Sequence, residues 1–411
     1  MWRLLAAVAM LGLAAPTAGA VDAGTSPRVL ERVILMRHGI RSPTKAPADL
    51  ARYASDPWPS WPVPPGQLTD HGRDTLRSLG GRLSQDLRDA GLPHDSCKGE
   101  VRVIADSTAR NQASAVALLA GLSPGCAPVY QAFPVGQDDP LFRGAAAGDD
   151  DDGGGIQAAA IDTQILQTLA VLQQVLLDCH DDACIARAKA GGKQVLLGGD
   201  AAKALKTAGS LSENIMLGYA EGMPAAQYGW GRLDAAGVAR LIGLHNASFR
   251  LAHATPAASR PRGGTMLAYV TATLAQAAAQ PTSAKTLVPS GTRVLVLLGH
   301  DTDLAAQAGL LGLDWHEATR GDDYPPGGAL VYDLVQTSTG KAVRLAVVMP
   351  TLNALRAGNM TAAGALVRQV LAQPACGGVT LCPVDRFVAV AASAAGSAVS
   401  AHAGDEPVVK P

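Results

Sequence analysis

Met36-Arg37-His38-Gly39-Ile40-Arg41-Ser42-Pro43 is the stretch that decides the fold, because an apolar run leads directly into a histidine between two arginines. The run 33–36 is β-branched at its start, and Gly39 and Pro43 close it. This pattern predicts a buried strand whose carboxyl end carries Arg37 and His38 into a loop. Ligand sites in open α/β sheets lie at such carboxyl ends.

Arg37 and Arg41 are four residues apart, with His38 between them. Two guanidinium groups can hold a phosphoryl group through paired, charge-assisted hydrogen bonds, which leaves the imidazole as a nucleophile or a further donor. The alternative is that both arginines pair with carboxylates while His38 caps a turn. These three residues alone leave both interpretations open.

The longer string that includes Thr44 and Lys45 carries a family resemblance. Arg-His-Gly-x-Arg-x-Pro resembles the signature of the histidine acid phosphatases, and Arg-x-Pro-Thr-Lys is most similar to their bacterial periplasmic phytases. The resemblance implies that His38 attacks phosphorus to form phosphohistidine, while Arg37 and Arg41 bind phosphate. It also implies a phosphoglycerate-mutase-like α/β domain with an inserted all-helical subdomain, and a reaction that requires neither a metal nor a cofactor.

The composition limits the classes of partner. The chain has 411 residues and a formal net charge of -1, and its pI is near 6.7. These values argue against a nucleic-acid-binding surface, and no polybasic segment suggests membrane binding. We therefore expect a small-molecule partner, which the resemblance implies is a phosphate monoester, and we expect the protein to be a monomer.

The N-terminus has the pattern of an export signal. Arg3 precedes the apolar segment 4–15, and Ala18-Gly19-Ala20 provides the small residues of a cleavage site. This segment is too short for a membrane anchor, so residues 1–20 are predicted to be a signal peptide. The resulting expectation is a periplasmic or secreted protein.

Six cysteines, an even number in an exported chain, indicate three disulfides rather than metal ligands. Zinc is the alternative, but the chain contains no Cys-x-x-Cys spacing. The positions resemble the disulfides of the periplasmic phytases, which implies the pairs Cys97 with Cys126, Cys179 with Cys184, and Cys376 with Cys382.

A second predicted strand, 101–105, ends at Asp106 and is followed by an Ala-rich helix with Arg110 on its first turn. A strand end followed by a helix N-terminus forms an anion site. In the family, an arginine at this position gives a third phosphate contact, although Asn111 stands here where the family usually has threonine. Asp106 is a further candidate for the substrate site.

The most strand-like run, 294–298, leads directly into Gly299-His300-Asp301-Thr302, and a helix is predicted over 304–313. The His-Asp pair matches the second signature of the family. The resemblance implies that His300 contacts phosphate and that Asp301 is the general acid. Helix capping is the alternative role for Asp301, and Asp106 and Glu213 are the other carboxylates considered as the acid.

Residues 156–279 have helical apolar spacing, which predicts an inserted subdomain. By resemblance, His245, Arg260 and Arg262 face the substrate cleft from it; the alternative is a capped helix with solvated arginines. Before it, Asp149–Asp152 form an acidic run whose unbroken spacing argues against a calcium loop. The predicted division is 21–140 and 286–395 for the α/β domain and 141–285 for the helical subdomain.

Two strands, 329–334 and 343–349, and a helix near 360–371 are predicted to complete the α/β domain, followed by a flexible tail over 396–411. A phosphoglycerate-mutase-type transferase and a non-catalytic phosphate-ester binder are weaker alternatives, given the export signal and the presence of both His38 and Asp301.

The substrate is the main open point. Lys45, Arg260, Arg262 and His245 favour a polyanion such as phytate, whereas the loop 63–69 is more similar to the glucose-1-phosphatases. We therefore expect a phytase working at acidic pH, with a glucose-1-phosphatase or broad sugar phosphatase as the alternative.

Overall fold

The computed structural model describes residues 27–143, 155–282, 284–317, 320–396 and 408–410. The predicted signal peptide and the acidic run Asp149–Asp152 lie outside these ranges. Among the described residues, no helix is both long enough and apolar enough to cross a membrane.

One sheet organises the described part of the chain. It has nine strands in the order β7-β6-β5-β1-β4-β2-β3-β9, and β8 pairs with β6. Neighbours β1, β4, β2 and β3 run parallel, whereas β5, β6, β7, β8 and β9 join by antiparallel pairing. The strands are β1 Arg28–Arg37, β2 Val101–Ala105, β3 Tyr130–Ala132, β4 Val294–Gly299, β5 Ala329–Thr337, β6 Gly340–Pro350, β7 Leu366–Val370, β8 Leu381–Pro383 and β9 Val408–Lys410.

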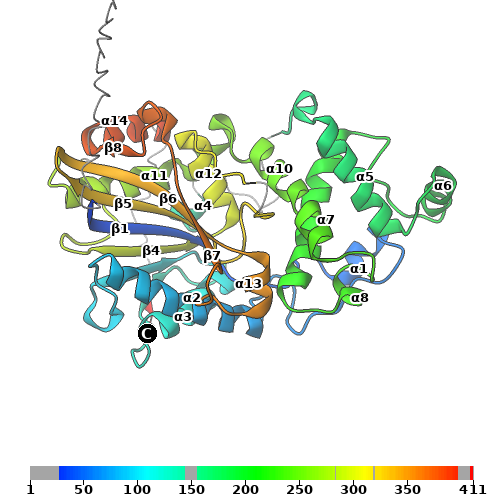
Figure 1. The fold of residues 1–411 in the computed structure, drawn as a ribbon, viewed down its shortest axis with the longest axis horizontal. Helices are drawn as coiled ribbons and strands as arrows, with labels where there is room; N and C mark the ends of the chain where they lie inside the picture. The colour runs from blue at the N-terminus through cyan, green and yellow to red at the C-terminus, as the bar shows by residue number, and fades with distance from the viewer. Residues whose placement is uncertain (1–26, 144–154, 283, 318–319, 397–407, 411) are drawn as a thin grey trace, which may run out of the picture.

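Helices cover both faces of the sheet (Figure 1). On one face lie α2 (Asp70–Asp89) and α3 (Ala109–Leu122), and on the other lie α4 (Pro140–Arg143), α11 (Pro256–Ala277), α12 (Asp301–Leu311) and α14 (Val384–Ala395). The alternation of side chains along β1 explains both layers: Val33 and Leu35 join one buried cluster, and Ile34 and Met36 join the other.

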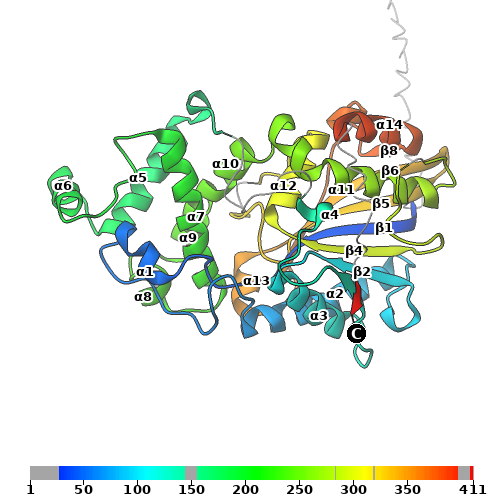
Figure 2. The same ribbon diagram turned by 180° about the vertical axis from the view of Figure 1, so that it is seen from behind.

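Six further helices form a separate layer at one end of the sheet, visible from both sides (Figures 1 and 2). They are α5 Thr163–Leu177, α6 Asp182–Ala190, α7 Ala201–Ala220, α8 Ala225–Tyr228, α9 Ala235–Leu241 and α10 Gly243–Ala252. The N-terminal helix α1 (Pro47–Leu50) and the Trp-Pro loop after it lie against this layer, where Trp58 packs edge-on against Trp230.

The predicted α/β fold with inserted helices is confirmed. The packing also bears on the domain boundaries, because α11 packs against α12 and α14 rather than against the helical layer. We propose that the helical subdomain ends near Ala252, before α11, instead of at residue 285.

Two local predictions differ from the structure. The helix predicted near 360–371 is wrong: α13 spans Leu352–Ala357, and Leu366–Val370 form β7, which pairs with β6. Alternating half-buried and exposed residues suit an edge strand there. Within the predicted flexible tail, Val408–Lys410 form β9 and pair with β3, because the edge of β3 offers unpaired backbone groups.

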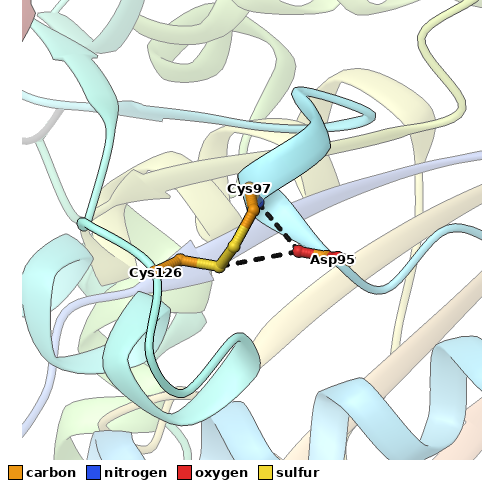
Figure 3. A group of neighbouring side chains, drawn as sticks. All are labelled: Asp95, Cys97 and Cys126. Atoms are coloured by element: carbon orange, nitrogen blue, oxygen red, sulfur yellow. Dashed lines mark hydrogen bonds between the residues drawn. A yellow bond between two sulfur atoms is a disulfide. The ribbon is translucent and has the colours of Figure 1, made fainter.

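The three disulfides join the pairs that the resemblance implies. Figure 3 shows Asp95 beside the bond between Cys97 and Cys126. The Asp95 carboxylate accepts a hydrogen bond from the backbone N–H of Cys97 at 2.9 Å. Its 3.6 Å contact with Cys126 Sγ is not a hydrogen bond, because a disulfide sulfur carries no proton.

Helices α2 and α3 cross at a glycine contact. A methyl group at Gly121 would lie 1.8 Å from the Arg77 carbonyl oxygen, and one at Gly80 would lie 2.1 Å from the Leu118 carbonyl oxygen. Backbone atoms cannot move aside as side chains can. This close approach fixes α3, and therefore Arg110, relative to the loop between β1 and α2.

Gly121→Ala is expected to lower the free energy of unfolding by about 1–3 kcal/mol, because the helices must separate to admit the methyl group. The matched control is Gly81→Ala, whose methyl group would meet nothing closer than 3.9 Å. That substitution should be neutral or stabilising by up to about 1 kcal/mol through helix propensity. Thermal unfolding of both variants tests this, and equal midpoints would contradict a close helix crossing.

Candidate active site

Three parallel strand ends bring together the polar residues predicted from separate stretches. Arg37 of β1 pairs in register with Gly299 of β4, and Leu298 pairs with Ala105 of β2. The residues that follow are therefore level with one another: His38 after β1, Asp106 after β2, and His300 and Asp301 after β4. The rings of His38 and His300 lie 5.4 Å apart.

His38 is fully buried, and its environment favours the neutral imidazole. Nδ1 lies 2.9 Å from the Gly39 carbonyl oxygen, which can only accept, so Nδ1 carries the proton. Burial lowers the pKa of His38 well below its ordinary value, and the positive charges of Arg110, Arg37 and Arg41 lower it further. Nε2 therefore keeps its lone pair, as a nucleophile requires.

Arg37 and Arg41 are held by carboxylates. Glu213 of α7 accepts hydrogen bonds from both guanidinium groups, at 3.1 and 3.2 Å from Arg41 Nη2. Burial raises the pKa of Glu213, but Arg41 and Arg37 outweigh burial and hold it below its ordinary value. The pairing that was the alternative interpretation thus exists here, and Glu213 takes the position that an anionic ligand of these arginines would need.

Asp106, His300 and Arg110 form a hydrogen-bonded chain. Asp106 Oδ2 lies 2.8 Å from His300 Nε2, and because a carboxylate accepts, this nitrogen carries the proton. His300 Nδ1 then accepts from Arg110 at 3.1 Å. Asn111, where the family usually has threonine, donates to the same Asp106 oxygen at 3.2 Å. Asp106 is fully buried and is absent from the cavity lining, and its contact with His300 fixes the orientation of that ring.

Asp301 faces Arg37 and the helical layer. One carboxylate oxygen lies 2.7 Å from Arg37 Nη2 and 3.8 Å from His245 Nε2. The capping carboxylate of α12 is instead Asp303, which accepts from the backbone N–H of His300 at 2.7 Å. Asp301 is therefore not required as the helix cap.

These groups open into a cavity of about 500 Å³ between the sheet edge and the helical layer. Of the other predicted substrate residues, Lys45, His245 and Arg262 line it. Arg260 does not: its Nε donates to the Ala394 carbonyl oxygen at 3.1 Å, at the end of α14. The reason is helical geometry, since residues two apart on α11 point to nearly opposite sides.

Sequence reasoning missed several lining residues, among them Lys206, Phe249 and His253. The signal that could have found them is helical spacing from residues already chosen. Lys206 lies two turns before Glu213 on α7, and His253 lies two turns after His245 at the end of α10.

Within the described residues, one group in the cavity has donors at metal-binding distances: Glu213, His245 and Asp301. The fit to a cation is poor, because Arg37 pairs with both carboxylates and its charge opposes that of a metal ion. The second such group contains Cys97 and Cys126, whose sulfurs are joined to each other and cannot act as thiolate ligands (Figure 3).

Comparison with known proteins identifies the family. Residues 29–165 match the model of the histidine phosphatase superfamily (branch 2). Phytase AppA of Escherichia coli (strain K12) is 31% identical over 354 residues, which cover 79% of this chain and 81% of that protein. The chain belongs to the histidine phosphatase superfamily. The resemblance predicted from the sequence is thereby confirmed.

Two further proteins are similar to this phosphatase over most of its length. The glucose-1-phosphatase of Salmonella typhimurium is 27% identical over 368 residues, 81% of this chain and 83% of that protein. A solved structure of Hafnia alvei phytase in complex with myo-inositol hexakis sulphate aligns with a TM-score of 0.75 at 26% identity, and covers 92% of this chain and 99% of that one.

Glu213→Gln is expected to strengthen inhibition by orthophosphate, because a neutral amide competes less well than a carboxylate for Arg37 and Arg41. We expect the inhibition constant to fall roughly tenfold, equivalent to about 1.4 kcal/mol. The matched control is Glu221→Gln at the residue that caps the C-terminus of α7, whose carboxylate accepts from the Thr69 hydroxyl outside the cavity. An unchanged or weaker inhibition in Glu213→Gln would show that the carboxylate does not compete with phosphate.

Proposed function

We propose that this histidine phosphatase is a phytase, which removes phosphate from a polyphosphorylated ring such as inositol hexakisphosphate at acidic pH. The observation that carries the proposal is the charge of the cavity. Five basic side chains line it against two carboxylates, Glu213 and Asp301, in a chain whose formal net charge is -1. The basic residues are Arg41, Lys45, Arg110, Lys206 and Arg262.

A single phosphate needs only the cations near His38. Lys45, Lys206 and Arg262 add positive charge on other parts of the wall, where a substrate with several phosphates would find partners. The relative from Escherichia coli is a phytase, and the Hafnia alvei phytase binds an inositol hexakis sulphate. The alternative, a glucose-1-phosphatase, is favoured by the Salmonella relative.

We assign the chemical roles as follows. Arg37, Arg41 and Arg110 hold the phosphoryl oxygens once the substrate displaces Glu213. His38 Nε2 attacks phosphorus, so a nitrogen–phosphorus bond forms as the bond to the ester oxygen breaks. His300, oriented by Asp106, gives a further contact to the phosphoryl group. Water then cleaves the phosphohistidine and releases orthophosphate.

Asp301 is the proposed proton donor to the leaving oxygen. Its carboxylate lies beside Arg37, where the phosphoryl group would bind. A bound phosphoryl group would therefore present its ester oxygen near this carboxyl group. Asp301 then supplies the proton that a departing ring alkoxide needs.

Relative kcat/KM on phytate and glucose-1-phosphate tests the substrate. We expect phytate to be preferred by roughly tenfold or more, because only phytate can use the cations remote from His38. A preference for glucose-1-phosphate would overturn the phytase assignment but leave the phosphatase chemistry in place.

The phosphoenzyme provides a separate test. After rapid mixing with labelled substrate and a quench in base or denaturant, the label is expected on the peptide that contains Arg37-His38-Gly39. His38→Ala should lose activity by far more than tenfold, since covalent catalysis contributes well above the roughly 1.4 kcal/mol that tenfold represents. A His38→Ala enzyme within tenfold of the parent would exclude His38 as the nucleophile.

Asp301→Asn separates acid catalysis from other roles of this residue. We expect kcat on phytate to fall by on the order of 10²-fold, whereas p-nitrophenyl phosphate, whose leaving group is a stable anion, should be affected much less. An equal loss on both substrates, with an unchanged unfolding midpoint, would mean that Asp301 is not the acid.

The proposal also covers where the enzyme acts and whether it acts as a monomer. Three disulfides among the described residues favour an oxidising compartment, so we propose export to the periplasm or the medium. We also propose that the enzyme acts as a monomer without a metal or another cofactor. Activity that survives a chelator, and a monomer mass by sedimentation, are the expected results.

A further inference from the structure

Two helices of the helical layer form one wall of the cavity. From α7 the wall includes Lys206, Ser210 and Glu213, and from the end of α10 it includes His245 and His253. These positions repeat at the spacing of a helix face. At 1.5 Å per residue, Lys206 lies about 10 Å along α7 from Glu213, and His253 lies about 12 Å along the chain from His245.

The two helices bring Lys206 and His253 to the same end of this wall. Glu213 and His245 lie close together at the inner end, near Asp301. A methyl group at Gly209 would lie 3.0 Å from Ser248 Cβ, so the helices cross between the two ends. Lys206 also lowers the pKa of His253, although less than burial and Arg262 do.

Positive charge exceeds negative charge around His253, because Arg262 and Lys206 lower its pKa and Asp301 raises it. Lys206 is exposed, and no carboxylate in the described part of the chain forms an ion pair with it. His253 is only 7% exposed. Burial and then Arg262 lower the pKa of His253 to about 4, so the neighbouring cations already disfavour its charged form. An anion placed among these groups would relieve this repulsion.

We propose that Lys206 and His253 form a second anion subsite, which binds a phosphate of the substrate other than the one being hydrolysed. The inference rests on the proposed function for the identity of its ligand. Lys206 and His253 line the same cavity as His38, and lie about 10–12 Å along their helices from Glu213 and His245, a spacing at which a ring carrying several phosphates can present a second group. Lys206 supplies charge, and His253 supplies an N–H donor that gains charge in acid.

Inhibition by myo-inositol hexakissulfate, a polyanion that is not a phosphate ester, tests the subsite directly. The readout is its inhibition constant against hydrolysis of p-nitrophenyl phosphate, a substrate with one phosphate. Lys206→Ala is expected to raise the inhibition constant three- to fivefold, and Lys206→Ala with His253→Gln about tenfold. KM for p-nitrophenyl phosphate should change by a clearly smaller factor.

Lys203→Ala is the matched control. It removes the same charge from an exposed position on α7 that does not line the cavity, so it should leave the inhibition constant unchanged. Lys206→Arg, which keeps the charge, should retain most of the inhibition. Equal inhibition constants for Lys206→Ala and Lys203→Ala would overturn the subsite, as would a parent enzyme that hexakissulfate does not inhibit.

Acidity gives an independent readout for His253. The groups that face its imidazole are Arg262 of α11, Asp301 of α12, Lys206 of α7 and His245 of α10. Because the imidazole gains charge as pH falls towards 4, the loss caused by His253→Gln should be larger at pH 4 than at pH 6. A loss that does not depend on pH would contradict a titrating contact.

The two proposals can fail separately. If the parent enzyme does not hydrolyse phytate, yet hexakissulfate inhibits it and Lys206→Ala weakens that inhibition, the phytase assignment fails while the subsite stands. If phytate is hydrolysed and Lys206 has no effect on either polyanion, the subsite fails alone.

Discussion

The buried guanidinium of Arg37 is the constraint on which the rest of the site depends. A charge without solvent must have charged or hydrogen-bonding partners, because an isolated buried ion costs several kcal/mol. Arg37 has none of its surface exposed, and its partners are Glu213, Asp301 and the Tyr324 carbonyl oxygen. These come from the helical layer, from the end of β4 and from the loop before β5. One side chain at the end of β1 therefore ties three parts of the chain together.

This arrangement balances the buried positive charge of a site that is built to bind an anion. Glu213 supplies negative charge to both Arg37 and Arg41. A phosphoryl group offers the same arginines more oxygen acceptors and more charge, so it can replace the carboxylate. The exchange has a cost, because Glu213 must then find other partners. Binding energy from the other phosphates of the substrate can offset that cost.

The sheet edge of the site was predictable from sequence, and the helical wall was only partly so. Each buried strand ends in a polar residue, so the meeting of His38, His300 and Asp301 follows from parallel neighbours whose carboxyl ends share one edge. By contrast, the pairing of Glu213 with Arg37 joins residues 176 positions apart, so no local sequence pattern predicts it. Arg260 and Arg262 look equivalent in sequence, yet helix rotation sends one of them to α14. The strand at Leu366–Val370 was missed because its pairing with β6, a tertiary contact, decides its conformation.

The buried titratable groups make the stability of the folded chain depend on pH. Burial raises the pKa of Glu31 to about 8 and those of Asp139 and Asp303 to about 7. Each of these carboxyls is protonated in the folded chain at a pH where the unfolded chain has lost the proton. Their contribution to stability is therefore full below about pH 4 and declines as pH rises towards 7.

The histidines act in the opposite direction. The pKa of His38 is lowered and that of His253 falls to about 4, so the folded chain binds fewer protons than the unfolded chain below about pH 6.5, and acidification costs stability there. Glu213 and Asp333, whose pKa values are lowered by arginine partners, lose their contribution only as the pH falls below about 4. The carboxyl groups thus offset the cost of keeping His38 neutral in mild acid. In mild acid the burial of His38 also keeps the unprotonated Nε2 that the proposed mechanism needs, so the same burial effects suit both the fold and the chemistry.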